Sequence, residues 1–176
     1  MAKIPFTKLK CKIEENIKEV SVGEDIVIEI KQYLPIQKKL ELIGNVIMYA
    51  HEQDANYSNP VKAAVIRDIE VVFAYTNIAF TEKQKEDIPK LYDLLKSSGV
   101  LNIIISNIPI EEYVEIVKGV EASIKSVYEY QNSAVGIIDT LKNKSDDLNI
   151  NIEELINSIE NPESLGTLKT IIEEII

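Results

Sequence analysis

The residues best suited to catalysis are few in this sequence. His51 is its only histidine and Cys11 is its only cysteine. A histidine-dependent triad would have to use His51, and no Gly-x-Ser-x-Gly nucleophile motif accompanies it. His51 stands at the end of a predicted helix, where we expect it to interact with the last carbonyl groups and the helix dipole. Cys11 alternates with Leu9 and Ile13, so we expect a small buried hydrophobic residue rather than a nucleophile.

Patterns that bind metals or phosphates are missing or incomplete. Zinc sites are usually built from several Cys and His side chains, and this chain has one of each. Residues 147–151 begin like a calcium-binding loop, but Ile152 stands where the loop needs glycine and Ser158 where it needs glutamate. Paired acids such as Glu111 and Glu112 are adjacent on a helix and do not face each other. The sequence therefore predicts no catalytic residue, no metal ligand and no cofactor, and hence a protein that is not an enzyme.

The composition indicates a folded and strongly acidic protein. Hydrophobic residues make up 45% of the 176 residues and charged residues 27%, which is an ordinary globular balance. The formal net charge of −10 argues against direct binding to nucleic-acid phosphates or to an anionic membrane surface. Residues 143–176 hold two lysines and eight acidic residues. Such a segment usually solvates a protein, and in other cases it contacts a basic partner or mimics nucleic acid.

Alternating residues near the N-terminus predict β-structure. Apolar residues alternate with lysines over residues 8–13, and isoleucines alternate with other residues over 26–31. Turn-forming residues separate these runs. The pattern therefore predicts a small antiparallel β-meander over residues 7–33. Pro35 then marks the change to helix, since proline suits the first turn of a helix.

Capping residues mark where several helices begin. Asn59 and Pro60 are typical of a helix N-cap followed by a proline in the first turn. Thr81 and Gln84 have the spacing of a capping box. Together with the apolar stripes between them, these signals predict helices across residues 35–141.

The clearest periodic signal covers residues 110–141, where apolar residues recur at spacings of three and four. It predicts one central helix of about 30 residues, roughly 45 Å long at about 1.5 Å per residue. The apolar stripe is wide, which favours packing against several neighbours over a two-stranded coiled coil. Gly119 and Gly136 fall on the polar side of this helix, where each should weaken it by about 1 kcal/mol.

These elements define the expected fold class and domains. We predict an α+β fold, mostly α, in which the β-meander packs on a bundle of five to seven helices. Residues 1–142 should form a single globular domain. Residues 143–176 should form an acidic linker and C-terminal helices that dock on this domain or on a partner. Docking on the protein's own core is favoured because it avoids the entropy cost of association.

Aromatic and apolar side chains supply the candidate protein-binding residues. Aromatic residues are common in the energetic centres of interfaces, although small proteins place them in the core more often. The chain also ends in isoleucines, which would form an apolar contact surface if they were exposed together. The candidates are Phe73, Tyr75, Phe80, Tyr128, Tyr130, Ile172, Ile175 and Ile176.

Several short stretches between residues 26 and 140 are similar to sequences of a known group of proteins. The stretches are residues 27–35, 74–78, 80–87, 90–95, 108–113 and 130–138. They resemble small proteins of tailed bacteriophages and prophages of low-GC Gram-positive bacteria, encoded near virion morphogenesis genes. None of the stretches is a catalytic motif, so the resemblance implies a lineage and transfers no site residue.

The resemblance, the missing catalytic motifs and the wide apolar stripe lead to one functional expectation. The chain should be a non-enzymatic phage morphogenesis protein that acts by protein–protein binding, as a virion component or a tail assembly chaperone. Its partners would be other phage proteins or copies of itself, in oligomers, without nucleic acid, membrane or cofactor. It would act in the host cytoplasm during assembly or in the virion, because residues 1–6 lack the apolar core of a signal peptide. The alternative is an acidic inhibitor or regulator that binds a basic site of a host protein.

Overall fold

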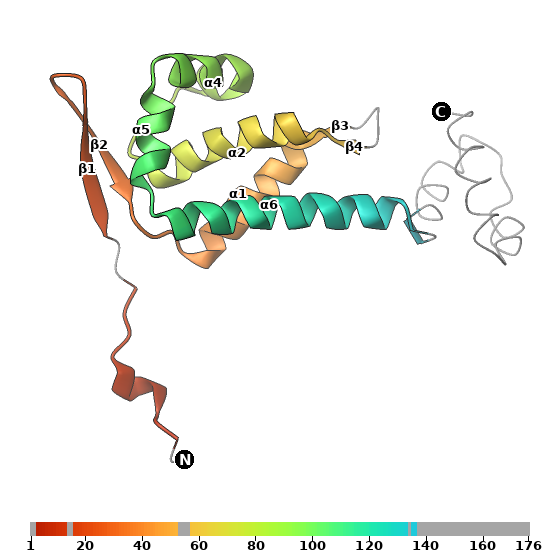
Figure 1. Ribbon diagram of the computed structural model, residues 1–176, viewed down its shortest axis with the longest axis horizontal. Helices are drawn as coiled ribbons and strands as arrows, with labels where there is room; N and C mark the ends of the chain where they lie inside the picture. Colours follow the sequence, from red (N-terminus) through yellow and green to blue (C-terminus); the bar gives the residue numbers. More distant parts are fainter. Residues whose placement is uncertain (1–2, 14–15, 53–56, 134, 137–176) are drawn as a thin grey trace, which may run out of the picture. The chain divides into compact units, whose positions relative to one another are not determined.

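The computed structural model describes residues 3–13, 16–52, 57–133 and 135–136 (Figure 1). Within these residues the fold is α+β and mostly α, as predicted, with an antiparallel hairpin at the N-terminal side and six α-helices. The described residues up to Ser123 belong to one compact unit, and those from Ile124 onward belong to a second. The predicted acidic linker and C-terminal helices lie outside the described residues.

The N-terminal β-structure is a two-stranded antiparallel hairpin, within the two or three strands that the sequence predicts. Strand β1 (Ile17–Val22) pairs antiparallel with β2 (Ile26–Lys31) along its whole length. Gly23 begins the turn with a φ of 72°, a left-handed conformation that glycine adopts without steric cost. Ile28 is 4% exposed and Ile30 is 0% exposed, so one face of β2 belongs to the core.

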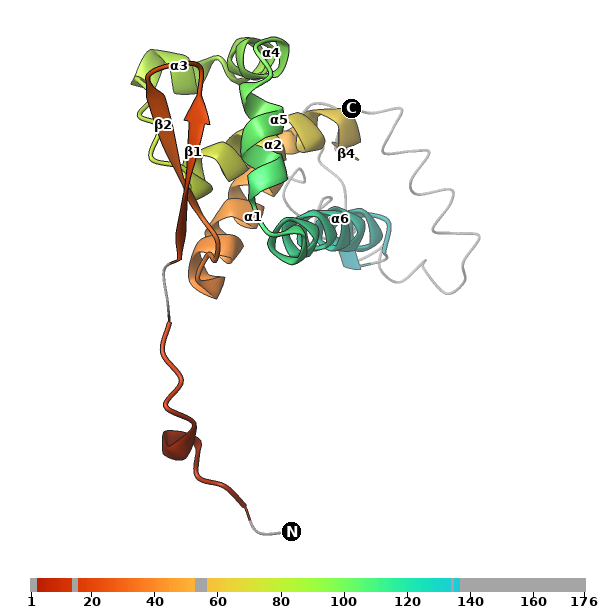
Figure 2. The same ribbon diagram turned by 60° about the vertical axis from the view of Figure 1, so that its left-hand side comes forward.

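Residues 3–13 precede the hairpin as an arm that contains no strand (Figures 1 and 2). The predicted strand over residues 8–13 is wrong, because Phe6–Leu9 is a 3-10 helix (η1) and the following residues have no regular structure. No strand among the described residues pairs with this segment, so it lacks the ladder that an extended backbone needs. Cys11 is consequently exposed, and the prediction that it is buried is also wrong.

Six α-helices follow the hairpin in the described part of the chain. They are α1 (Ile36–Ala50), α2 (Pro60–Tyr75), α3 (Glu82–Glu86), α4 (Ile88–Ser97), α5 (Val100–Asn107) and α6 (Ile110–Gln131). Two very short strands, β3 (His51–Glu52) and β4 (Tyr57–Ser58), pair between α1 and α2. The predicted count of five to seven helices is therefore met by the described residues.

The predicted caps of α2 and α3 are confirmed. Asn59 Oδ1 accepts hydrogen bonds from the N–H groups of Val61 and Lys62, at 3.0 and 3.2 Å. The Thr81 hydroxyl accepts from the Gln84 N–H at 3.3 Å, and the Gln84 side chain accepts from the Thr81 N–H at 2.9 Å. Each cap satisfies N–H groups that have no partner inside the helix.

The structure gives the central place to α2 rather than to the helix that begins at residue 110. Helix α2 packs against α1, α4 and α5. It buries Ala63, Ile66, Ile69, Val71, Val72 and Tyr75. In α6 only Ile116 and Val120 are buried. The physical reason is that a strong single stripe marks a helix with one buried face, whereas a helix covered on several sides is apolar nearly all round.

Helix α6 ends at Gln131, about ten residues before the predicted end of this helix. Asn132 and Ser133 follow as a turn and a bend. Asn132 Nδ2 donates to the Tyr128 carbonyl at 2.8 Å, and the Ser133 hydroxyl donates to the Tyr130 carbonyl at 2.6 Å. Such side chains compete with backbone N–H groups for the carbonyls of the last helical turn. This competition favours the end of the helix at this point, although apolar residues continue at helical spacing in the sequence.

Gly119 faces α1, so the prediction that it lies on the polar side of its helix is wrong. A Cβ atom added at Gly119 would lie 2.5 Å from Cδ1 and 3.5 Å from Cγ1 of Ile43 in α1. The missing side chain therefore leaves room for the Ile43 side chain against α6.

We expect Gly119→Ala to lower the free energy of unfolding by about 1 kcal/mol. Overpacking costs about 1–3 kcal/mol, and the better helix propensity of alanine offsets about 1 kcal/mol of that. In an Ile43→Val background, which lacks Cδ1, the same substitution should instead stabilise the protein by about 1 kcal/mol. Urea denaturation of the single and double variants measures both values. An equal effect of Gly119→Ala in the two backgrounds would show that the contact is not the cause.

Candidate functional site

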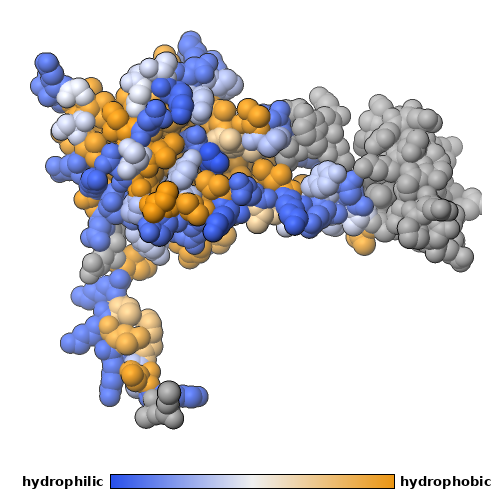
Figure 3. All heavy atoms as spheres, viewed as in Figure 1, coloured by the Kyte–Doolittle hydropathy of each residue, from blue (hydrophilic) through white to orange (hydrophobic). Residues whose placement is uncertain are grey.

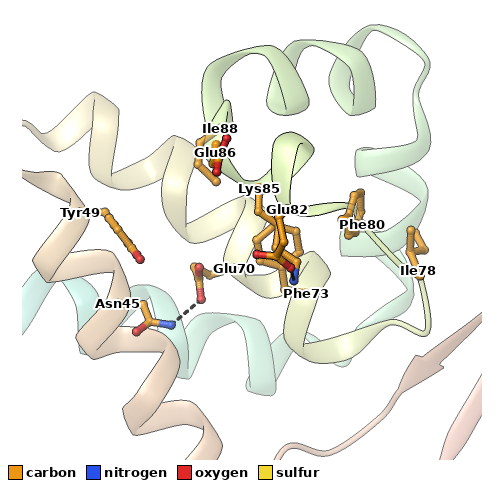
Figure 4. Close-up of a pocket in the computed structure, with 11 residues that line it drawn as sticks. Asn45, Tyr49, Glu70, Phe73, Ile78, Phe80, Glu82, Lys85, Glu86 and Ile88 are labelled. Atoms are coloured by element: carbon orange, nitrogen blue, oxygen red, sulfur yellow. Dashed lines mark hydrogen bonds and ion pairs between the residues drawn. The ribbon is translucent and has the colours of Figure 1, made fainter.

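A pocket of about 890 Å³ opens between α1, α2, α3 and the start of α4 (Figure 4). It mixes apolar, aromatic and acidic side chains, which come from four helices and from the segment between α2 and α3. The lining residues are Asn45, Tyr49, Glu70, Phe73, Ile78, Ala79, Phe80, Glu82, Lys85, Glu86 and Ile88. Its volume lies within the range of about 300–1,000 Å³ that is common for ligand sites.

The segment that follows α2 forms one wall of the pocket, and the hairpin holds this wall in place. Thr76 ends α2, with its hydroxyl donating to the Val72 carbonyl at 2.7 Å. Thr76 also forms a β-bridge with Ile30 of β2, and the Asn77 side chain accepts from the Glu29 N–H at 3.1 Å. The hairpin thereby fixes the backbone from which residues 78–80 reach the pocket.

Two aromatic rings form an apolar part of the pocket. The ring centroids of Phe73 and Phe80 lie 5.1 Å apart, with an interplanar angle of 62°. This edge-to-face arrangement is favourable for aromatic pairs. Phe73 belongs to α2 and Phe80 to the segment before α3, so their contact packs this segment against α2 at the pocket. Both rings keep part of their surface accessible, since each residue is only half-buried.

Carboxylates give the pocket a negative charge. Glu70 lies half-buried in α2, and Asn45 Nδ2 donates to its Oε2 at 3.0 Å (Figure 4). Burial raises the pKa of Glu70, and the hydrogen bond from Asn45 opposes this rise only in part. Glu82 and Glu86 are exposed on α3, where Lys85 Nζ lies 2.8 Å from a Glu82 oxygen. That exposed ion pair contributes little energy. The lining holds three glutamates and one lysine, so the pocket has an excess of acidic groups.

The combination of groups in the pocket suits an apolar side chain that lies beside a cation. The Phe73 and Phe80 rings can cover an apolar group, and burial there is favourable by about 25 cal/mol per Å² of apolar surface. Glu70 has no ion-pair partner among the residues that the structure describes, so a basic group from a partner would supply its countercharge. Binding of a cation would therefore lower the pKa of Glu70 from its raised value.

A buried ionic cluster joins α1, α2 and α6. The Glu112 carboxylate lies at its centre, with a side chain that is 13% exposed. It accepts hydrogen bonds from Lys39 Nζ at 2.8 Å, from the Tyr75 hydroxyl at 2.9 Å and from the Leu34 N–H at 3.0 Å. Burial disfavours the charged form of Lys39, but the hydrogen bonds and charges of Glu112 and Glu115 outweigh it and raise the Lys39 pKa. The satisfied partners indicate a structural role.

A second polar cluster joins α2 to α6. Arg67 donates from Nε and Nη2 to Oδ1 of Asp68, at 3.0 and 2.7 Å. The Tyr113 hydroxyl donates to the same oxygen at 2.9 Å. Burial, followed by the negative charge of Asp68, raises the pKa of Tyr113 to about 12 from an ordinary value of 10.0.

The free energy of unfolding should fall as the pH rises from 10 to 12. Folded Tyr113 holds its proton to a higher pH than the unfolded chain does. Its contribution to stability is therefore complete below pH 10 and is lost as the pH rises towards 12. Urea denaturation across this range measures the fall. Tyr113→Phe removes the titrating hydroxyl, so the fall should be shallower in this variant, and an equally steep fall would contradict the assignment.

His51 stands at the end of α1, as predicted, but among the described residues its ring Nδ1 atom makes no hydrogen bond to the last carbonyl groups. It is the residue after the last helical position, and it begins the short strand β3. Its backbone N–H donates to the Ile47 carbonyl. The ring Nδ1 atom is buried and has no hydrogen-bond partner among the described residues.

The structure brings some of the sequence-predicted binding residues together and separates others. Phe73 and Phe80 meet in the pocket. Tyr75 is 0% exposed and its hydroxyl donates to Glu112, so it is not part of a binding surface. Tyr128 and Tyr130 are 61% and 51% exposed on α6 and belong to the second compact unit. The three isoleucines Ile172, Ile175 and Ile176 lie outside the described residues.

Sequence reasoning missed the polar residues of the pocket. Asn45 and Tyr49 come from α1, and Glu82 and Glu86 come from an exposed helical turn whose pattern indicates only solvation. Glu70 carried a usable signal, because it is an acidic residue between buried apolar neighbours in α2. A charge in such a run indicates either an ion pair or a cavity.

Comparisons with known proteins do not assign this chain to a family. No protein-family model, curated protein or solved structure matches the chain. Within the described ranges, no group of three or more His, Cys, Asp or Glu side chains could hold a metal ion. None of the helices that the structure describes combines the length and the apolar character needed to cross a bilayer.

Proposed function

We propose that this chain is a non-enzymatic protein of bacteriophage morphogenesis that acts by binding other proteins through the pocket between α1, α2, α3 and α4. The observation that carries the binding part is the pocket itself, in which the Phe73 and Phe80 rings lie beside the carboxylate of Glu70. The phage part rests on the sequence resemblance across residues 26–140. A protein partner is consistent with both the binding role and the phage role, because virion assembly proceeds through contacts between proteins.

The pocket favours this role over that of an acidic inhibitor. An inhibitor of a basic site would place its carboxylates on a projecting surface that enters the host protein. Here Glu70 is half-buried inside a concavity, next to Asn45 and Phe73. Carboxylates in a concavity receive a basic group from a partner and do not enter the partner's own site. The two exposed carboxylates of α3 extend the same concavity at its rim.

The proposal predicts that pocket variants of a phage that carries this gene fail to assemble particles. Phe80→Asp places a negative charge in the apolar part of the pocket, and Glu86→Lys reverses a charge at the exposed rim. Both should cut the yield of infectious particles by at least about tenfold, the effect of a loss of about 1.4 kcal/mol in binding. Val61→Asp is the matched control, because Val61 is 72% exposed on α2 and does not line the pocket.

Electron microscopy and mass spectrometry of the purified particles complete this test. Incomplete heads or tails in the pocket variants would support the role in morphogenesis. Presence of the chain in mature particles identifies a virion component, and its absence there identifies an assembly chaperone. If both variants fold, as urea denaturation reports, and still give normal particles, the proposed function is wrong.

A further inference from the structure

The arm of residues 3–13 presents apolar side chains that nothing in the described chain covers. Phe6 is 72% exposed and Leu9 is 58% exposed. They are the first and last residues of η1, a 3-10 helix, in which residues three apart lie on the same side. Figure 3 shows hydrophobic surface on the arm beside hydrophilic surface. Several large apolar side chains on one short exposed segment usually mark a contact surface.

The charge of the arm is opposite to that of the pocket. Residues 3–13 contain four lysines and no acidic residue. The pocket is lined by three glutamates and one lysine, and that lysine is already paired with Glu82. Both surfaces also place apolar groups next to their charges. The arm and the pocket are therefore complementary in charge, and each offers apolar surface to the other. Opposite charges attract and steer association, and they disfavour partners with the wrong charge.

We infer that the arm of one copy of this chain binds in the pocket of a second copy. Phe6 and Leu9 of the arm contact the Phe73 and Phe80 rings, and the arm lysines lie against the pocket carboxylates. This inference rests on the proposed function of the pocket as a protein-binding site, and it names the partner of that site as the chain itself.

The position of the arm favours a second copy over the pocket of the same chain. Every residue of the arm is exposed, so the arm does not pack on its own body. Arm and pocket are different surfaces, so a contact between them repeats from copy to copy. Repetition of such a heterologous contact produces a closed ring or a filament.

Mixed-disulfide formation tests the inference, because the single cysteine of the chain, Cys11, is exposed in the arm. With oxidised glutathione as the oxidant, the native chain is mixed with a size-tagged variant that carries Cys11→Ser and Ala79→Cys, with the new thiol on the exposed wall of the pocket. We expect the mixed disulfide to form at least about tenfold faster than with the control, because docking raises the effective concentration of the two thiols. The control carries Cys11→Ser and Lys118→Cys, since Lys118 is exposed on α6 and does not line the pocket. Equal rates would overturn the inference.

Charge reversal provides a second measurement with residues that are all exposed, so folding should be unaffected. Glu82→Lys with Glu86→Lys, added to the pocket variant, should abolish the faster reaction with the native arm. Lys8→Glu with Lys10→Glu, added to the arm partner, should restore it with the charge-reversed pocket. A reaction that remains fast after the first change, or that the second change does not restore, contradicts the proposed contact.

A chain that keeps Cys11 and also carries Ala79→Cys decides between the same copy and a second copy. At high dilution we expect this chain to form no disulfide within itself, and at high concentration we expect linked oligomers on a non-reducing gel. Rapid closure within a single chain at high dilution would show that the arm binds its own pocket, which would overturn the assignment to a second copy.

The outcomes separate this inference from the proposed function. If the mixed disulfide forms no faster than in the control, while Phe80→Asp still blocks particle assembly, the inference fails and the pocket binds a different protein. If the mixed disulfide forms faster, while the pocket variants assemble normal particles, the self-association stands and the proposed role in morphogenesis fails.

Discussion

Glu112→Ala should lower the free energy of unfolding by about 3–5 kcal/mol, the usual cost of removing one partner from a buried ionic cluster. The carboxylate is 13% exposed and accepts three hydrogen bonds, from Lys39, Tyr75 and the backbone of Leu34. Its removal leaves the Tyr75 hydroxyl and the Leu34 N–H buried without their acceptor. Lys39, which is 4% exposed, would retain Glu115 as its one counterion among the described residues. Since a typical domain is stable by about 5–15 kcal/mol, this change should remove a large part of the stability.

Glu111→Ala is the matched control for this prediction. Glu111 and Glu112 both lie in the first turn of α6, so either substitution loses the same favourable interaction with the helix dipole. Glu111 is exposed, and its loss should change stability by no more than about 0.5–1 kcal/mol. Urea denaturation measures both variants. Similar values for the two would mean that the buried cluster contributes nothing beyond the dipole interaction.

Ile30→Ala should lower the free energy of unfolding by about 2–5 kcal/mol, the range for truncating a fully buried aliphatic side chain. Ile30 is 0% exposed in β2, and its backbone forms the bridge to Thr76. The substitution should therefore loosen the contact between the hairpin and the segment that forms one wall of the pocket. We expect thermal or urea unfolding to show the loss of stability.

Ile26→Ala is the control, with the same substitution in the same strand. Ile26 is 63% exposed, so its truncation should cost less than about 0.5 kcal/mol. Hydrogen exchange adds a local measurement, because the Glu29 N–H donates to Asn77 at the pocket wall. Faster exchange of this N–H in Ile30→Ala, but not in Ile26→Ala, would show that the hairpin holds the wall. Equal stability of the two variants would contradict the burial of Ile30.

The starts of α2 and α3 could be predicted from the sequence, because each depends on neighbouring residues. Asn59 reaches N–H groups two and three positions along the chain, and Thr81 and Gln84 bond each other within one helical turn. A capping residue finds its partner wherever the helix lies in the fold. The mostly α class of the fold also followed from local periodicity, which reflects the preference of each segment for one buried face.

Whether residues 8–13 form a strand could not be decided from the sequence, because alternating apolar residues do not show that a second strand pairs with them. A strand forms only when another strand accepts its backbone hydrogen bonds, and none of the described residues does so for this segment. The exposure of Cys11 follows from the same cause. In the sequence, apolar residues and lysines alternate over this segment. Only the tertiary structure showed that all of them are exposed in a single copy.

The pocket is the part that the tertiary structure alone decided. The sequence by itself determined the aromatic character of Phe73 and Phe80, the acidity of the chain and the caps that begin its helices. The hydrogen bond between Asn45 of α1 and Glu70 of α2 could not be predicted from the sequence, because that contact depends on how the two helices pack. Packing also placed Tyr75 inside the core while Phe73, two residues earlier, faces the pocket, since residues two apart point to different sides of a helix. Burial and long-range contact, which are properties of the whole fold, therefore selected which of the predicted side chains can meet a partner.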